Sequence, residues 1–142
     1  MKPSLKAGLI HRFSYKVPEN KTVPYTYPES PDIASMPKVF ATGFMIVLIE
    51  WTCLQLIAQH LDVGEGSLGT HVNVSHLAAT PPGMTVTVDA ELIEVSGRKL
   101  TFNVKAHDGT DLIGEGRHER TVVPWDKFNA RVREKALAAG LA

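Results

Sequence analysis

Glu50 is the residue whose position most strongly suggests chemistry. It follows the apolar run 43–49 and precedes Trp51, in a segment that reads as a buried helix. Burying a carboxylate costs several kcal/mol unless it is partnered, and burial raises the pKa of carboxyl groups toward the range used in acid-base or nucleophilic catalysis. The alternative is that Glu50 lies on a narrow solvent-exposed stripe with Gln55, or pairs with a basic group. We favour the catalytic interpretation.

His76 is the second candidate. In the segment 68–76, Val72, Val74 and His76 share one face of an alternating strand, and His71 lies on the other, polar face. A histidine on an apolar face is commonly a core residue. In the fold inferred below, however, this face would meet the helix that carries Glu50. An imidazole beside a carboxylate there would form a general base or an oriented general acid.

Thr42 is the third candidate, beside Gly43 at the start of the same helix. A threonine there can cap the helix by accepting a hydrogen bond from a backbone amide. Alternatively, the amino end of the helix can stabilise an oxyanion, and a neighbouring glycine lets a ligand approach the backbone. Eight residues separate Thr42 from Glu50, which is about 12 Å of helix rise. They cannot touch directly, so His76 or a dimer partner must link them.

Other chemistries find little support in the sequence. The glycine-rich segment 64–69 lacks the Lys-Ser/Thr of a phosphate-binding loop, and the six histidines show no metal-ligand spacing, so we expect neither a metal nor another cofactor. Fifteen basic and fifteen acidic residues balance to zero, which argues against nucleic acid as a ligand. The single cysteine, Cys53, fits the core and permits no internal disulfide, so we expect a cytoplasmic protein.

The 142 residues suit one domain, 1–142, which begins with a first strand at 7–17. Five of the nine prolines fall in 18–38, which predicts irregular chain that covers something. A helix follows from Phe40 or Thr42 to His60. Its length would span a membrane, but Glu50 stands at its centre, where a charge is most costly. We therefore expect a buried helix and no membrane association.

Four further strands are expected, separated by short turns that include Ser96-Gly97 and Asp108-Gly109. These turns predict an antiparallel meander of strands at 68–79, 84–95, 99–107 and 112–123, followed by an amphipathic helix at 124–139. A helix this apolar must be covered nearly all round, and a curved sheet of about five strands wrapped around it would do so. That α+β arrangement is the hotdog fold. Open sheet edges and a partly uncovered helix also predict a homodimer.

Several blocks of the sequence resemble the fluoroacetyl-CoA thioesterase family, from about residue 7 to 135. The most specific are Val39-Phe40-Ala41-Thr42-Gly43-Phe44-Met45 with Glu50-Trp51, Gly64-Glu65-Gly66-Ser67-Leu68-Gly69-Thr70, His76-Leu77-Ala78-Ala79-Thr80-Pro81-Pro82-Gly83 and His118-Glu119-Arg120.

The resemblance implies a homodimeric hotdog hydrolase that cleaves a short acyl-CoA thioester, with coenzyme A as part of the substrate. It assigns the catalytic set to Thr42, Glu50 and His76. It also implies substrate-binding residues: Gly69 near the thioester, Arg120 near the acyl group, and Phe40 before the helix.

The family's lid is the point of departure. The resemblance implies phenylalanines that cover the acyl group, where this chain has Ile33 and Met36. Two other functions compete with the thioesterase. A hotdog hydratase acting on enoyl-CoA is disfavoured in its Asp-x4-His form, because no aspartate here has a histidine five residues later. A non-catalytic acyl-CoA-binding domain would not need Thr42, Glu50 and His76 together.

Overall fold

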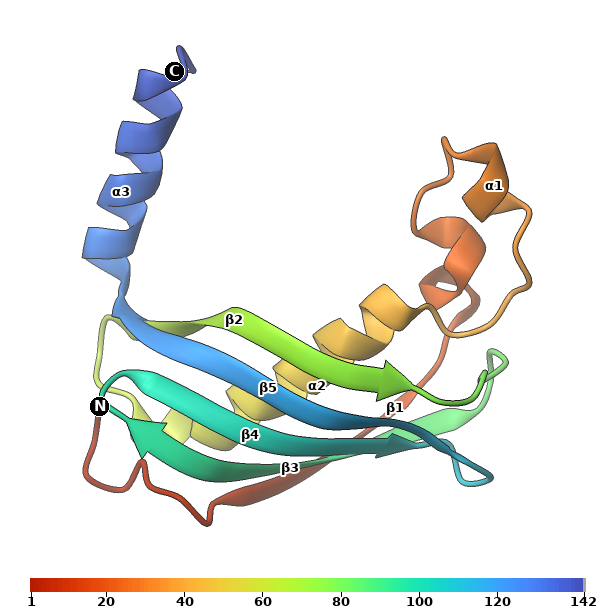
Figure 1. Ribbon diagram of the computed structural model, residues 1–142, viewed down its shortest axis with the longest axis horizontal. Helices are drawn as coiled ribbons and strands as arrows, with labels where there is room; N and C mark the ends of the chain where they lie inside the picture. Colours follow the sequence, from red (N-terminus) through yellow and green to blue (C-terminus); the bar gives the residue numbers. More distant parts are fainter. Residues whose placement is uncertain (142) are drawn as a thin grey trace.

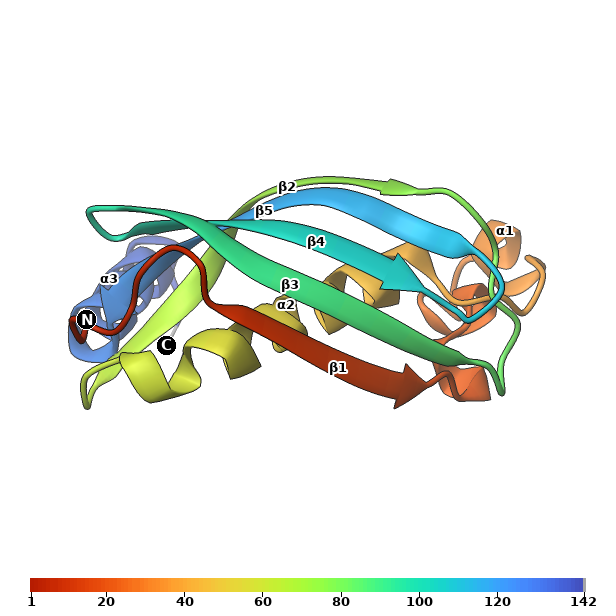
Figure 2. The same cartoon turned by 90° about the horizontal axis from the view of Figure 1, so that it is seen from below.

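One five-stranded antiparallel sheet curves around a long helix in the computed structural model, which describes residues 1–141 (Figures 1 and 2). The strand order is β1-β3-β4-β5-β2, so β1 and β2 form the two edges. This arrangement confirms the predicted hotdog fold. The strands are β1 (Ile10–Lys16), β2 (Glu65–His76), β3 (Thr85–Ser96), β4 (Lys99–His107) and β5 (Leu112–Pro124).

The predicted four-strand meander is correct for β3, β4 and β5 and wrong for β2. Tight turns at Gly97 and Gly109, both with positive φ, join the three central strands as hairpins. β2 pairs with β5 instead of with β3. The connection 77–84 is too long for a two-residue hairpin and contains two adjacent prolines. It crosses the end of the sheet from β2 to β3 (Figure 1).

The central helix α2 (Thr42–Ile57) continues into a 3-10 turn, η3 (Ala58–His60). It lies across the concave face of the sheet (Figure 2), and Met45, Ile49 and Cys53 join the hydrophobic core. By length and composition alone the stretch Thr42–His60 could cross a membrane. As expected for a helix that a single chain leaves partly uncovered, one stripe of it is open: Val47 is 56%, Trp51 45% and Leu54 38% exposed.

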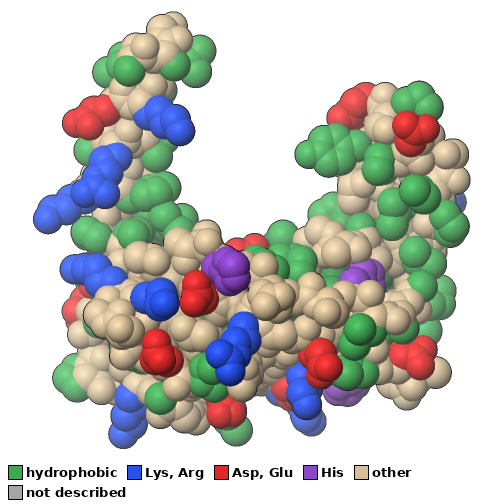
Figure 3. All heavy atoms as spheres, viewed as in Figure 1, with side chains coloured by type: hydrophobic (Ala, Val, Ile, Leu, Met, Phe, Trp, Pro, Cys, Tyr) green, Lys and Arg blue, Asp and Glu red, His purple; other side chains and the backbone are tan. Residues whose placement is uncertain are grey.

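Two parts of the chain project from the same side of this body (Figure 1). The proline-rich segment forms two 3-10 turns, η1 (Glu19–Lys21) and η2 (Val23–Tyr25), and a single-turn helix, α1 (Pro31–Ala34). At the opposite end, β5 runs into α3 (Trp125–Ala138), which has no buried residue. The space-filling view shows a wide hollow between the two projections (Figure 3). The edge strand β2 borders that hollow.

Candidate active site

Glu50 points from α2 toward the strand pair β2–β5, where it meets Arg120. Nη1 of Arg120 donates a hydrogen bond to Oε1 of Glu50 over 3.0 Å. The guanidinium is also tied to Ser67, through Nε to the hydroxyl (2.8 Å) and through Nη2 to the carbonyl oxygen (2.9 Å). The Arg120 side chain is 5% exposed and that of Glu50 is 28% exposed. A fixed, buried cation therefore holds a carboxylate that still reaches solvent.

His118 is a member of this cluster that the sequence analysis did not single out. It is 1% exposed, and its Nε2 lies 3.1 Å from Nη1 of Arg120 and 3.8 Å from Oε1 of Glu50. The sequence did contain a signal for His118. It lies at every second position with Arg120 and the apolar Val122, so the three residues share the inward face of β5.

Gly69 on β2 makes the approach of Glu50 possible. A methyl group on Gly69 would overlap Oε1 of Glu50 and would lie 3.2 Å from the ring of His118. The β2–β5 register also shifts between Gly69 and His71, which marks a bulge at this point. A side chain at position 69 would therefore displace the Glu50 carboxylate from its place beside Arg120, and Gly69 is also a candidate for contact with the thioester.

Thr42 and His76 form a second cluster at the amino end of α2. The Thr42 hydroxyl and Nδ1 of His76 are hydrogen-bonded over 2.7 Å. Of the two interpretations of Thr42, the helix cap does not hold, because Ala41 is the N-cap residue and Thr42 is the first residue of the helix. Because the Thr42 hydroxyl does not bond a backbone amide of the helix, it is available to the His76 imidazole.

The His76 imidazole is neutral and leaves one ring nitrogen without a partner in the described part of the chain. Burial lowers the pKa of His76, which favours the neutral ring near pH 7. Its Nε2 is buried and has no hydrogen-bond partner among residues 1–141. A buried ring nitrogen without a partner is costly, so this atom is suited to meet a group from outside the chain.

The two clusters are not joined within one chain. The sequence analysis placed the face of β2 that bears His76 against α2, and the contact with Thr42 agrees with that placement. It also expected His76 to meet Glu50. Within residues 1–141, however, no hydrogen bond or ion pair links His76 to Glu50, because His76 lies at the start of α2 and Glu50 about two turns further along. Each chain thus carries two separate halves of the candidate catalytic set.

The three candidate residues of the proline-rich segment have different environments. Ile33 is half-buried, and Met36 is 49% exposed on the projecting lobe. Phe40 is 2% exposed and belongs to the hydrophobic core. The Phe40 ring therefore offers almost no surface to a substrate, whereas Ile33 and Met36 are placed where a ligand or a second chain could reach them.

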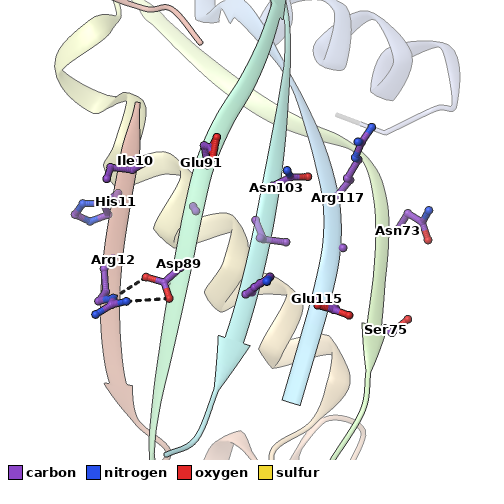
Figure 4. A pocket seen from close by; sticks show the side chains of 14 residues that line it. Ile10, His11, Arg12, Asn73, Ser75, Asp89, Glu91, Asn103, Glu115 and Arg117 are labelled. Atoms are coloured by element: carbon purple, nitrogen blue, oxygen red, sulfur yellow. Dashed lines mark hydrogen bonds and ion pairs between the residues drawn. The ribbon is translucent and has the colours of Figure 1, made fainter. Parts of the chain in front are cut away.

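Another hollow, of about 1080 Å³, is not at this site. It lies on the outer face of the sheet and is lined by polar and charged side chains such as Arg12, Asp89 and Glu115 (Figure 4). α2 crosses the opposite face. Glu50 and Arg120 instead line a shallow pocket of about 350 Å³ with Val47, Trp51 and Leu54. Residues 1–141 contain no group of three His, Cys, Asp or Glu side chains placed to hold a metal ion.

Comparison with known proteins decides the family. Residues 18–126 match the model of the fluoroacetyl-CoA-specific thioesterase family. The chain belongs to this family. It is 54% identical to the fluoroacetyl-CoA thioesterase of Streptantibioticus cattleyicolor over 138 residues, which is 97% of this chain and 99% of that protein. Membership in the fluoroacetyl-CoA-specific thioesterase family confirms the prediction of an acyl-CoA thioesterase, a hydrolase.

Solved structures agree with this assignment. A variant of the fluoroacetyl-CoA thioesterase in complex with fluoroacetate superposes with a TM-score of 0.90 at 54% identity, covering 92% of this chain and 98% of that one. A thioesterase superfamily member from Thermus thermophilus gives a TM-score of 0.84 at 31% identity, covering 97% and 99%.

Proposed function

We propose that the protein hydrolyses short acyl-CoA thioesters, fluoroacetyl-CoA among them, with a catalytic set of Thr42, Glu50 and His76 drawn from two copies of the chain. The observation that carries the proposal is the pair of half-sites: a carboxylate held by Arg120, and a hydroxyl-imidazole pair whose Nε2 has no partner within residues 1–141. The family's thioesterase activity supplies the reaction.

Glu50 has two routes to the thioester carbonyl. Its free oxygen, Oε2, either attacks the carbonyl carbon to give an anhydride that water then cleaves, or takes a proton from a water molecule whose oxygen attacks. In both routes the carbonyl oxygen becomes an oxyanion, for which the Thr42 hydroxyl and nearby amides are candidate donors. Its collapse breaks the carbon–sulfur bond and releases the CoA thiolate. The neutral His76 imidazole takes up the proton that the attacking water loses, by way of Glu50 where Glu50 is the base, and passes it to this thiolate. The products are the free acid and CoA.

A homodimer would complete the site. The outer edge of β2 is free in the single chain, and the open stripe of α2 exposes Val47 and Trp51. A second copy seated in the hollow of Figure 3 would cover both. If two β2 edges pair antiparallel about their centre, the end of β2 that carries Gly69 in one chain comes to lie beside the end that carries His76 of the partner subunit. Glu50, which touches Gly69, would then face that imidazole.

The dimer is testable in solution. Light scattering of the purified protein at micromolar concentration is expected to give twice the mass of the 15.5 kDa chain. Val72→Lys should shift the mass toward the monomer, because a charge on the exposed β2 edge opposes strand pairing. Val63→Lys is the matched control, since Val63 is fully exposed in the turn that precedes β2 and takes no part in the strand. A wild-type protein that stays monomeric would contradict the proposal.

The two lid residues, Ile33 and Met36, affect which acyl groups the site can accept. Isoleucine is smaller than an aromatic ring, and methionine is flexible and fills irregular space, so Ile33 and Met36 would close less tightly over a small acyl group than two phenylalanines. A methylene in such a pocket is worth about 1–3 kcal/mol. We therefore propose that this chain accepts a broader range of short acyl groups than an enzyme with a fully aromatic lid.

The acyl range can be measured as kcat/KM for fluoroacetyl-, acetyl-, propionyl- and butyryl-CoA, with release of free thiol as the readout. We expect a graded series, in which kcat/KM differs by no more than about 200-fold between substrates that differ by one methylene. Ile33→Phe/Met36→Phe should sharpen the preference for the smaller acyl groups. A strict preference for fluoroacetyl-CoA in the unaltered chain, with the others inert, would exclude Ile33 and Met36 as determinants of selectivity.

We propose a cytoplasmic location for the enzyme. The support is the lone Cys53, which is buried and for which burial raises the pKa to about 12, so it is an unreactive thiol suited to a reducing compartment.

A further inference from the structure

His118 connects every element that surrounds the Glu50 carboxylate. It comes from β5, stacks on Phe102 of β4 with ring centroids 6.3 Å apart, and reaches the carbonyl oxygen of His71 on β2 through Nδ1 over 2.8 Å. Its Nε2 faces Arg120 and Glu50. The charged groups around the ring are thus Arg120 on its own strand, Glu50 on α2 and the adjacent Glu119.

The hydrogen-bond partners determine the protonation of the ring. A carbonyl oxygen can only accept, so Nδ1 carries the hydrogen that points to His71. Nη1 of Arg120 can only donate, so Nε2 must present a lone pair to it. Burial, first of all, and the nearby guanidinium both lower the pKa of His118, in agreement with a neutral ring. His118 is therefore a fixed acceptor aimed at Arg120.

We propose that His118 is a positioning residue for Glu50: it accepts one N–H of Arg120 Nη1 and so limits that nitrogen to a single hydrogen bond with the carboxylate. Nη1 has two N–H groups, and they are shared between Oε1 of Glu50 and Nε2 of His118. The other guanidinium nitrogens are directed to Ser67. Oε2 of Glu50 consequently has no hydrogen-bond partner among residues 1–141 and is left for the reaction.

Removing the acceptor would change what Arg120 does. An N–H of Nη1 would then be buried without a partner, which is costly, and the Glu50 carboxylate, whose Oε1 lies 3.0 Å from Nη1, is an acceptor within reach. If the guanidinium turned to engage both carboxylate oxygens, Glu50 would become a weaker base and a weaker nucleophile. This step rests on the proposed function, because it takes Glu50 as the reacting carboxylate.

Three substitutions separate the acceptor from the rest of the ring. His118→Gln places a side-chain oxygen near the position of Nε2 and keeps the acceptor. His118→Asn keeps a donor near Nδ1 for His71 but removes the acceptor. His118→Phe keeps the ring that packs on Phe102 and removes both. We expect kcat for acetyl-CoA to fall about 10- to 100-fold in the Asn and Phe variants and to stay within about threefold of wild type in the Gln variant, with KM unchanged in all three.

The Glu50→Gln variant tests the proposed function separately from the role of His118. Glu50→Gln is measured alone and combined with His118→Asn; the second substitution should add nothing once the carboxylate is gone. Normal activity of Glu50→Gln would overturn the proposed function, whatever His118 does. With Glu50 confirmed, equal losses in the Gln and Asn variants, or wild-type kcat in the Asn variant, would overturn the positioning role. If the Phe variant does not fold, the Gln–Asn contrast decides.

Discussion

Glu50→Gln and His76→Ala are each expected to lower kcat/KM for acetyl-CoA by at least about 100-fold, the usual contribution of a general acid-base group. Glutamine keeps the hydrogen bond from Arg120 but can neither accept a proton nor attack a carbonyl carbon. Alanine at 76 removes the imidazole that bonds the Thr42 hydroxyl and faces the leaving group. Free thiol release measures the loss, and the melting temperature reports whether the fold survives.

Matched controls make the same chemical changes away from the site. Glu115→Gln alters an exposed glutamate of the outer-face hollow, and His107→Ala removes a half-exposed histidine at the end of β4. Both are expected to keep wild-type turnover. Near-normal activity in folded Glu50→Gln and His76→Ala proteins would show that neither residue takes part in the chemistry.

Restoration of activity in a mixed dimer is the second large effect. A dimer that pairs one Glu50→Gln chain with one His76→Ala chain, isolated by two different affinity tags, should recover about half of the wild-type turnover. One of its two sites would combine intact His76 from one chain with intact Glu50 from the other. The second site would hold both substitutions and be silent.

Each homodimeric variant prepared with the same tags is the reference for the mixed dimer. If Glu50 and His76 of one chain served the same site, every site of the mixed dimer would lack one group. Turnover would then remain at the level of the single variants, about one hundredth of wild type. That outcome would refute a site shared between subunits and leave the individual residue roles intact.

The local parts of the fold follow from the sequence, and the long-range strand pairing does not. Ser96-Gly97 and Asp108-Gly109 predict hairpins because their backbone geometry suits tight turns, and β3, β4 and β5 pair accordingly. Alternation cannot say which strand lies beside β2, since any neighbour would satisfy its apolar face. The pairing of β2 with β5 depends on how the 77–84 connection crosses the sheet, which no local signal encodes.

The same division holds for the site. Glu50 is conspicuous in sequence because a lone carboxylate stands in an apolar helix, and His76 because it shares a face with Val72 and Val74. The contact between Thr42 and His76 required the placement of β2 against the start of α2. The alternation of β5 places His118 and Arg120 on one face, but the hydrogen bonds that join Arg120 to Ser67 and to His118 depend on the pairing of β2 with β5. Partners of a charged group are set by tertiary geometry.

The position of β2 at the sheet edge also sets when the enzyme can first become active during synthesis. β2 supplies Gly69 and His76, yet its only partner strand in the described fold, β5, follows it by roughly 40 to 60 residues in the chain. β3, β4 and β5 can pair as local hairpins, whereas β2 can pair only after β5 has left the ribosome. A nascent chain that ends before Leu112 would hold β2 unpaired and exposed to aggregation. The chain's own part of the active site is therefore completed late in synthesis, with its last strand.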